Sequence, residues 1–384
     1  MREAAATAGL APDRLAGRRV VLVHDWLTGM RGGEKVLESL CRLFPTADLV
    51  TLVHARGSAS PLIEARRVRT SIAQRLPRAT RLYRHYLPLF PTAIELFDLD
   101  DADVVISTSH CAAKAVVPTG RAMHVCYCHS PMRYAWDQFE SYFGAERVGR
   151  GMNLAMRPVM AWLARWDRAT ASRVDRFVAN SHYVAGRIAR YYNRRATVLY
   201  PPVDTEFFTP AARPPQSYFL VVSALVPYKR IDLALAAAER LQAPLKVVGA
   251  GPDLARLRAR AGPTVEFTGQ LGDEALREAY RGATAVLLTG EEDFGIVPVE
   301  AMACGRPVVA LGRGGACETV EDGVTGVLVP DGSPAAFADA MWRVTTLELD
   351  PAVLRRHAET FGVERFERAF QTILDETLAA GRGC

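Results

Sequence analysis

Short apolar runs alternate with longer amphipathic stretches along most of this chain. In the first half, six runs predict buried strands, over residues 20–23, 48–53, 104–107, 123–128, 176–179 and 198–200. In the second half, six more do so, over residues 218–223, 245–249, 265–268, 285–289, 307–310 and 327–329. Apolar runs of this length, without strict alternation, are typical of strands buried on both faces. Strand and helix alternating at this spacing predict an α/β protein with parallel sheets and right-handed crossovers.

A proline-rich stretch separates the two halves. The five prolines Pro201, Pro202, Pro210, Pro214 and Pro215 exclude regular helix or a central strand there. We therefore predict two Rossmann-like domains facing each other across a cleft. The predicted segments are a polar extension (1–18), the first domain (19–200), a linker (201–216), the second domain (217–360) and a final helix that packs back toward the first domain (361–384).

Two helical stretches of the first half are also predicted. One begins after a glycine-rich turn and runs from about Glu34 to Phe44. The other is a long, partly apolar segment from Tyr134 to Ser172.

Length and composition narrow the class of protein. A chain of 384 residues can bury the cores of two domains, and its formal charge of +5 is mild. Seven cysteines at irregular spacing predict reduced thiols rather than a disulfide framework. No apolar run approaches the ~18 residues needed to span a bilayer. These features favour a cytosolic enzyme or binding protein.

Basic residues are concentrated in one stretch of the first half. Between Arg66 and Arg84 there are seven arginines and no acidic residue. The stretch fits docking on an anionic membrane surface, and it fits a solvated basic face of the first domain equally well. Binding of nucleic acid is disfavoured, because the aromatic residues are not spaced as a base-stacking platform.

The clearest candidate chemistry lies between two predicted strands of the second half. Glu292 and Glu300 are eight positions apart, with a loop first and a helix second. In that arrangement both carboxylates can face the crevice at the carboxyl end of the sheet, where open α/β sheets bind ligands. The Phe294-Gly295 step lets backbone N–H groups approach a ligand closely. The segment suits a hydroxyl-rich ligand held by charge-assisted hydrogen bonds.

Four further features are weaker, and each has an ordinary structural explanation. The turn Gly29–Gly33 suits phosphate binding or merely a tight strand-to-helix turn. Lys229 and Arg230 could neutralise a diphosphate or form a solvated basic pair. Gly249-Ala250-Gly251 lacks the third glycine of a dinucleotide-binding turn. His129 ends an apolar strand, where histidine is more often packed or capping than catalytic.

Taken together, these motifs show that the chain resembles a retaining glycosyltransferase of the GT-B fold, family 4. The resemblance covers the chain from about Arg19 onward. The segment from Glu292 to Glu300 matches the family's Glu-x7-Glu signature. The stretches 24–35, 128–137 and 222–232 are similar to bacterial mannosyltransferases that build O-antigen or exopolysaccharide repeat units.

The resemblance implies a role for each matching residue. Glu300 would bind the nucleotide ribose, Glu292 the sugar hydroxyls and Lys229 the diphosphate, while His129 would lie near the anomeric carbon. The implied catalytic residues are His129, Lys229 and Glu292. The implied donor-binding residues are Gly32, Gly33, Lys229, Arg230, Gly249, Gln270, Leu271, Glu292, Asp293, Phe294, Gly295, Ile296 and Glu300. The implied acceptor-side residues are Arg133, Trp136 and Asp137. One departure is Ala224, where many family members carry an arginine that contacts the diphosphate.

The resemblance also implies the reaction. The donor would be GDP-mannose and the acceptor a lipid-diphosphate-linked saccharide, with no metal or cofactor. The enzyme would be cytoplasmic, either free or peripheral on the inner face of the cell membrane. Because no carboxylate is placed as a glycosidase-type nucleophile, a same-face attack is the preferred hypothesis for retention. The alternatives are a GT-B sugar-nucleotide epimerase and a non-catalytic sugar-nucleotide-binding protein.

Overall fold

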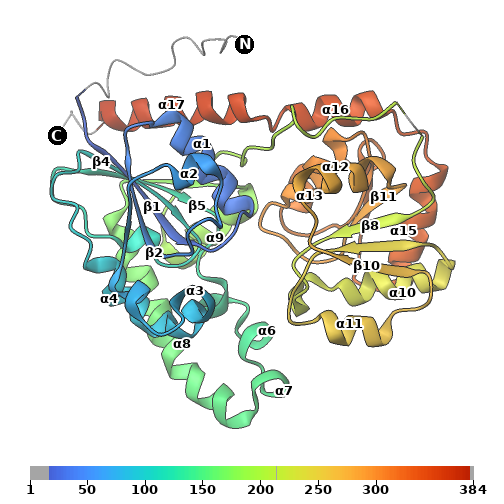
Figure 1. Cartoon of the computed structure of the whole chain (residues 1–384), viewed down its shortest axis with the longest axis horizontal. Helices are drawn as coiled ribbons and strands as arrows, with labels where there is room; N and C mark the ends of the chain where they lie inside the picture. The colour runs from blue at the N-terminus through green and yellow to red at the C-terminus, as the bar shows by residue number, and fades with distance from the viewer. Residues whose placement is uncertain (1–16, 213, 381–384) are drawn as a thin grey trace. The chain divides into compact units, whose positions relative to one another are not determined.

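The structure is a computed structural model that describes residues 17–212 and 214–380 (Figure 1). The chain forms two compact units. The first contains the residues up to Pro202 and those from Glu364 onward, and the second contains Val203–Val363. Most of the predicted polar extension (1–16), linker position 213 and the last four residues of the final segment lie outside the described residues.

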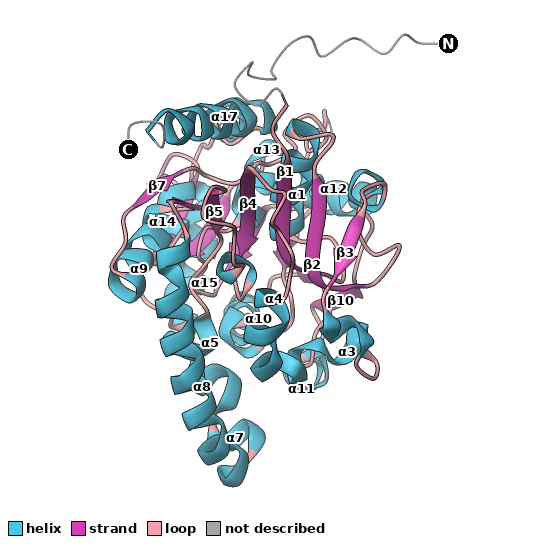
Figure 2. Cartoon of the chain, turned by 90° about the vertical axis from the view of Figure 1, so that its left-hand side faces the viewer, coloured by secondary structure: helices cyan, strands magenta, loops and turns pink. Residues whose placement is uncertain are grey.

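The first unit is built on a seven-stranded parallel sheet in the order β3-β2-β1-β4-β5-β6-β7. Figure 2 shows these strands side by side. Their bounds are β1 Val20–Leu27, β2 Asp48–His54, β3 Val68–Thr70, β4 Val104–Ser109, β5 Met123–Cys128, β6 Arg176–Ala179 and β7 Ala196–Val198.

Helices and 3₁₀ turns connect and cover this sheet. They are α1 Gly32–Leu43, α2 Pro61–Glu64, η2 Ile72–Arg75, α3 Ala79–Leu82, η3 Tyr83–Leu89, α4 Phe90–Glu95, η4 Ala113–Ala115, α5 Arg133–Trp136, α6 Phe139–Phe143, α7 Ala145–Val148, α8 Arg150–Thr170, η5 Ala171–Arg173, α9 His182–Tyr192 and α17 Val363–Ala380.

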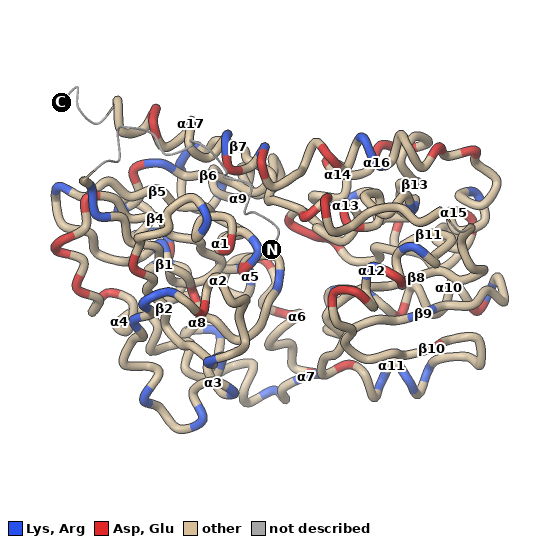
Figure 3. The backbone as a smooth tube through the Cα atoms, turned by 45° about the horizontal axis from the view of Figure 1, so that its top comes forward, with Lys and Arg blue, Asp and Glu red and all other residues tan. Residues whose placement is uncertain are grey.

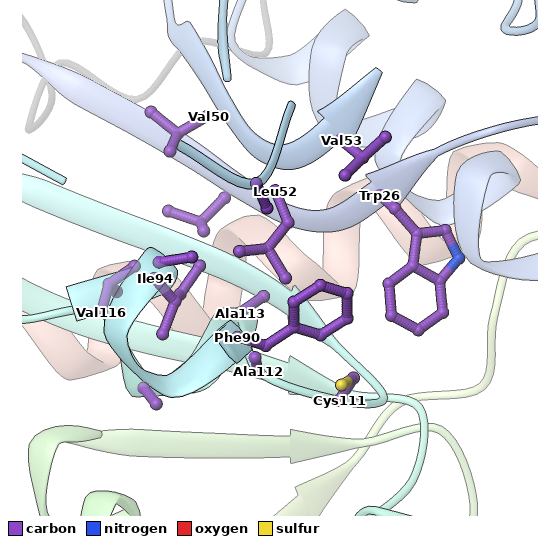
Figure 4. Packing of buried hydrophobic residues seen from close by; sticks show 14 of the residues in the cluster. Trp26, Val50, Leu52, Val53, Phe90, Ile94, Cys111, Ala112, Ala113 and Val116 are labelled. Carbon is purple, nitrogen blue, oxygen red and sulfur yellow. The ribbon is translucent and has the colours of Figure 1, made fainter. Parts of the chain in front are cut away.

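Two hydrophobic clusters pack on this sheet. One contains Trp26, Leu52 and Phe90, whose side chains lie close together in Figure 4. The other joins strand residues such as Leu22 to α1 and to α17, which contributes Phe366 and Phe370. The last helix of the chain therefore completes the core of the first unit, although it follows the second unit in sequence.

The second unit is built on a six-stranded parallel sheet in the order β10-β9-β8-β11-β12-β13. Its strands are β8 Phe219–Val222, β9 Leu245–Val248, β10 Val265–Gly269, β11 Ala285–Leu288, β12 Val308–Leu311 and β13 Gly326–Val329. Its helices are η6 Pro227–Lys229, α10 Ile231–Leu241, α11 Leu254–Arg260, α12 Asp273–Gly282, α13 Ile296–Ala303, α14 Ala316–Thr319, α15 Pro334–Thr346 and α16 Pro351–Glu359.

The prediction of two parallel α/β sheets is confirmed, and three local predictions were wrong. The short strand β3 was missed because it lies inside the arginine-rich stretch. The strand predicted at residues 198–200 lies at Ala196–Val198 instead. The helical segment predicted from Tyr134 to Ser172 is broken into α5, α6, α7 and α8. Gly144 and Gly149 adopt non-helical backbone angles at two of these breaks, with φ of +82° at Gly149.

Candidate active site

In the second unit, Lys229 and Glu292 are joined at the carboxyl end of the sheet. The Lys229 ammonium donates a hydrogen bond to Glu292 Oε1, and the side chains are only 16% and 12% exposed. The hydroxyl of Thr289, just after β11, donates to the Lys229 backbone carbonyl over 2.9 Å. A Cβ on Gly290 would lie 2.7 Å from Lys229 Cα, so this close approach requires glycine. Two loops that are far apart in sequence therefore bring the Lys229 ammonium against the Glu292 carboxylate.

The loop that carries Glu292 is held by a glycine turn that follows β12. The Glu292 carbonyl accepts a hydrogen bond of 2.8 Å from the Gly315 N–H. A Cβ on Gly315 would lie 2.3 Å from Phe294 Cα. Phe294 is buried against Phe361, with ring centroids 5.7 Å apart. Gly295, at φ +87°, then begins α13. The Phe-Gly step is thus a rigid entry to the helix rather than a loose loop.

Glu300, on α13, is also held by a side chain from another element. The hydroxyl of Tyr280, on α12, donates to Glu300 Oε2 over 2.6 Å. Burial, reinforced by the charge of Glu300, raises the pKa of Tyr280 well above its usual value. Tyr280 therefore stays protonated as a donor, and its bond fixes one oxygen of the carboxylate.

The remaining predicted donor residues have different surroundings. A Cβ on Gly249, which has φ +138°, would lie 1.9 Å from the Ser223 carbonyl oxygen, so glycine is required there by loop packing. Gln270 is exposed and Leu271 half-buried, directly after β10. Arg230 adopts a left-handed φ of +51° and pairs with Asp232 at 3.3 Å. Its guanidinium is therefore already paired with the carboxylate of Asp232 in the first turn of α10.

In the first unit, the glycine-rich turn meets His129. Gly32 and Gly33 begin α1, and a Cβ on Gly33 would lie 3.5 Å from His129 Nε2. Burial, followed by the neighbouring His110 and His24, lowers the pKa of His129 to about 3. Its Nε2 is buried with no hydrogen-bond partner among the described residues. The predicted turn and the predicted histidine are therefore direct neighbours, and the histidine is neutral at physiological pH.

Sequence reasoning missed a buried polar cluster beside His129. His24 and Asp25 lie in the second half of β1, Glu34 lies in the first turn of α1, and His110 follows β4. His24 Nδ1 shares a 2.7 Å hydrogen bond with the Thr108 hydroxyl, and its Nε2 lies 3.9 Å from Glu34 Oε1. Burial alone would raise the pKa of Glu34, but the neighbouring His24 imidazole lowers it. The available signal was that Asp25 and His110 each lie shortly after a predicted apolar strand, at 20–23 and 104–107.

Comparison with known proteins decides the family. The family described as Glycosyltransferase Family 4 matches residues 30–207, and the one described as Glycosyl transferases group 1 matches residues 216–346. The chain belongs to glycosyltransferase family 4. The first match runs on into the predicted linker and the second begins at the last residue of that linker. The resemblance to this family is confirmed.

Curated relatives match about half of the chain. The chain is 36% identical over 233 residues to a D-inositol 3-phosphate glycosyltransferase of Geodermatophilus obscurus, covering 52% of each protein. It is 32% identical over 224 residues to a protein of the same name from Mycolicibacterium smegmatis, covering 51% of each. The chain thus spans about half the length of the curated relatives it matches.

Solved structures of low sequence identity share the whole fold. Anabaena HepE in complex with UDP superposes with a TM-score of 0.68 at 19% identity, covering 93% of this chain and all of that one. Sucrose-phosphate synthase of Thermosynechococcus elongatus gives 0.69 at 18% identity, covering 94% of this chain and all of that one. The GT-B fold of this family 4 chain is therefore confirmed.

The residues predicted on the acceptor side make contacts within the first unit. The Trp136 indole N–H donates to Asp167 over 2.7 Å, and its ring stacks on Tyr191. Asp137 pairs with Arg187 at 2.8 Å. Arg133 is half-buried at the start of α5. The contacts of Trp136 and Asp137 anchor α5 to α8 and α9, and their role toward an acceptor stays a prediction.

The arginine-rich stretch divides into two groups. Arg66 donates to the backbone carbonyls of Cys41 and Pro45, and Arg69 to that of Asp98. In contrast, Arg75, Arg78, Arg81 and Arg84 are exposed around α3, where Figure 3 shows basic residues in blue. Arg67 is exposed as well, so it and this second group are available to a charged surface.

The described residues offer neither a cluster of metal ligands nor a membrane-spanning helix. Within residues 17–212 and 214–380, no group of three or more His, Cys, Asp or Glu side chains is arranged to hold a metal ion. In the same residues, no helix combines the length and hydropathy required to cross a bilayer.

Proposed function

We propose that this protein is a retaining glycosyltransferase that transfers a hexose from a nucleotide sugar to an acceptor. The observation that carries the proposal is the pair of signature carboxylates in a family 4 chain. Within the second unit, Glu292 is bound to Lys229 and Glu300 to Tyr280. This combination of a cation and fixed acceptors suits a diphosphate beside a hydroxyl-rich sugar and ribose.

The chemistry of transfer explains why Lys229 matters. Positive charge develops on the anomeric carbon while negative charge develops on the departing diphosphate. A lysine ammonium held in place stabilises that diphosphate more in the transition state than in the ground state. Glu292 keeps the ammonium in position before the donor arrives. In the same-face mechanism the leaving phosphate accepts the proton of the acceptor hydroxyl, so no covalent sugar–enzyme species forms.

The donor we propose is GDP-mannose, and the acceptor is a lipid-diphosphate-linked saccharide of cell-surface polysaccharide synthesis. The support is the similarity of residues 24–35, 128–137 and 222–232 to bacterial mannosyltransferases. Uridine nucleotides are the main competitors, because the Anabaena HepE structures contain UDP, UDP with glucose, or UDP-glucose.

A ligand screen followed by a transfer assay tests the proposal. Thermal shift against GDP-, UDP-, ADP- and dTDP-sugars identifies the base, since a ligand at a hundred times its Kd stabilises by about 2.7 kcal/mol. The donor so found is then incubated with a lipid-linked saccharide in EDTA. We expect a glycosylated product with retained anomeric configuration. An epimerised donor would indicate the epimerase instead, and binding without turnover a non-catalytic protein.

The location of the enzyme is a separate part of the proposal. We propose that it works at the inner face of the cell membrane, where the exposed Arg75, Arg78 and Arg81 meet anionic lipid. The competing interpretation is a solvated basic face in a cytoplasmic enzyme. If co-sedimentation with anionic vesicles is unchanged when these three arginines become glutamate, their part in docking is excluded.

A further inference from the structure

Helix α8 has one buried face and one exposed face of unusual composition. It has 21 residues, about 30 Å of helix, and it extends past the end of the sheet with α7 beside it (Figure 2). Asn153, Met160, Leu163, Asp167 and Thr170 are buried. At ~100° per residue, Leu154, Pro158, Ala161 and Arg165 fall within about 60° of one another on the opposite side.

The exposed face is largely apolar. Leu154 is 71% exposed and Trp162 is 45% exposed, with Met152 at the same end of the helix as Leu154 at 53%. At ~100° per residue Trp162 lies about 80° from Leu154, so both are on the exposed side of α8, whereas Met152 lies about 160° from Leu154. Exposed apolar side chains scattered singly are ordinary, but several on one side of a helix mark an interaction surface. An exposed tryptophan next to cationic residues is typical of a membrane–water interface, where an amphipathic ring lies at headgroup level.

All the charged side chains of α8 are arginines except for one. Arg165 and Arg168 are exposed and have no hydrogen-bond or ion-pair partner among the described residues. The only acidic residue of α8 is Asp167, which is buried and pairs with Lys114 at 2.9 Å. The exposed face of α8 therefore presents cations without neutralising carboxylates of its own.

An open recess adjoins the arginine end of this face. It has a volume of about 500 Å³ and is lined by Arg165, Arg168, Ala169, Ser172, Tyr192, Asn193 and Arg194. Arg194 is fixed in place, because its guanidinium donates to the carbonyls of Ala171 and Val174 over 2.8 and 2.6 Å. Three guanidinium groups around one recess form a site for phosphate, with Arg165 and Arg168 free to bind it.

We infer that the exposed face of α8 docks on an anionic phospholipid bilayer. Trp162 and Leu154 enter the interface, and lipid phosphates occupy the recess at Arg165, Arg168 and Arg194. This surface is separate from the arginines around α3 and does not depend on the proposed reaction. A second copy of the chain fits less well, because pairing two such faces would place unpaired arginines close to one another. A nucleic acid fits less well too, because Trp162 is the only exposed aromatic side chain of α8.

The test uses the full-length protein and vesicles of phosphatidylcholine, alone or mixed with phosphatidylglycerol. We expect binding to the mixed vesicles that weakens with salt. The double variant Arg165→Glu with Arg168→Glu should reduce partitioning roughly tenfold or more. Leu154→Glu should also reduce it. The matched control is Arg240→Glu with Arg260→Glu, which changes the net charge equally at two exposed arginines of the second unit and should retain binding.

Further measurements distinguish bilayer docking from self-association and from binding of free phosphate. Tryptophan emission of the wild type should shift to shorter wavelength on mixed vesicles, and Trp162→Phe should lose most of that shift. Partitioning that is equal for the α8 variants and the control would overturn the inference. So would a change in self-association, rather than in vesicle binding, in Leu154→Glu. Inorganic phosphate alone at matched ionic strength should not release the protein; complete release would indicate a site for free phosphate and overturn bilayer docking.

Discussion

The Asp25 carboxylate accepts hydrogen bonds from four consecutive backbone N–H groups, and its Oδ2 also lies 3.1 Å from Nδ1 of His110. The four donors are the N–H groups of residues 110–113, at 2.6 to 2.9 Å. Asp25 is fully buried in the second half of β1. One side chain thus fixes the whole turn after β4 and orients His110, whose ring centroid lies 6.3 Å from that of His129.

Replacing Asp25 by asparagine should strongly destabilise the first unit. The asparagine NH₂ group would face backbone N–H donors where a carboxylate oxygen now accepts. Charge-assisted hydrogen bonds contribute about 1.5–3 kcal/mol each, so we expect a loss of about 3–5 kcal/mol in urea unfolding. His110→Gln removes only the side-chain contact and should cost about 1 kcal/mol. Equal effects of the two variants would contradict the role of the backbone bonds.

Lys229→Met should slow transfer with little effect on the fold. Loss of one charge-assisted hydrogen bond to the diphosphate, worth ~1.5–3 kcal/mol, corresponds to roughly a ten- to a few hundred-fold decrease in kcat/KM. Lys246→Met is the control, since Lys246 belongs to the same unit but pairs with Glu266 at 3.7 Å. Combining Lys229→Met with Glu292→Gln should be less than additive, because the two side chains act as a pair. Full additivity would argue against a shared role.

Glu300→Gln should weaken nucleotide binding. The carboxylate loses charge-assisted acceptance from the ribose hydroxyls, so we expect about a tenfold rise in the Kd for the nucleoside diphosphate by calorimetry. Tyr280→Phe removes the 2.6 Å bond that orients Glu300 and leaves the carboxylate itself. It should raise the Kd less than Glu300→Gln does. An unchanged Kd in both variants would remove Glu300 from the binding site.

Gly249→Ala should destabilise the second unit by at least about 2 kcal/mol, through both positive φ and steric overlap. The added Cβ would lie 1.9 Å from the Ser223 carbonyl oxygen. Gly262→Ala is the matched control, because a Cβ there meets nothing within 4 Å. Its free energy of unfolding should stay within about 0.5 kcal/mol of the wild type. Chemical denaturation of both variants measures the difference, and similar stabilities would refute the packing argument.

Stability should fall in mild acid because of His124. This residue is fully buried, shares a 2.7 Å hydrogen bond with Ser107 Oγ, and has its pKa lowered from 6.5 to about 4, chiefly by burial. Below pH 6.5 the unfolded chain takes up a proton that the folded chain refuses until about pH 4. Above pH 6.5, neutral His124 therefore does not reduce the free energy of unfolding. As the pH falls from 6.5 toward 4, the free energy of unfolding decreases.

Urea titrations at pH 7 and pH 5 measure this effect. Between those values His124 should account for about 2 kcal/mol of lost stability. His124→Gln has no titrating group there, so its stability should fall by about 2 kcal/mol less than that of the wild type over the same range. An identical fall in the two proteins would show that His124 does not cause the acid sensitivity.

The sequence by itself determined the two parallel sheets and the family. Buried strands between crossover helices leave a local pattern of apolar residues. That pattern predicted the strands of both sheets, except that it missed β3 and placed β7 two residues too late. The Glu-x7-Glu segment could also be recognised from sequence. It is a loop followed by the start of a helix, which is a local feature. The prolines at positions 201–215 likewise marked the boundary between the halves, and the units divide between Pro202 and Val203.

The tertiary structure decided which side chains meet. Asp25 and His110 are 85 positions apart, and Lys229 and Glu292 are 63 apart, so no local pattern could pair them. Their proximity follows from strand order, which brings the carboxyl ends of neighbouring parallel strands to one edge of each sheet. The same reason holds for Gly249, whose lack of a side chain is explained by a carbonyl on the adjacent strand's loop. Local pattern specifies the elements, whereas sheet register specifies the chemistry at their ends.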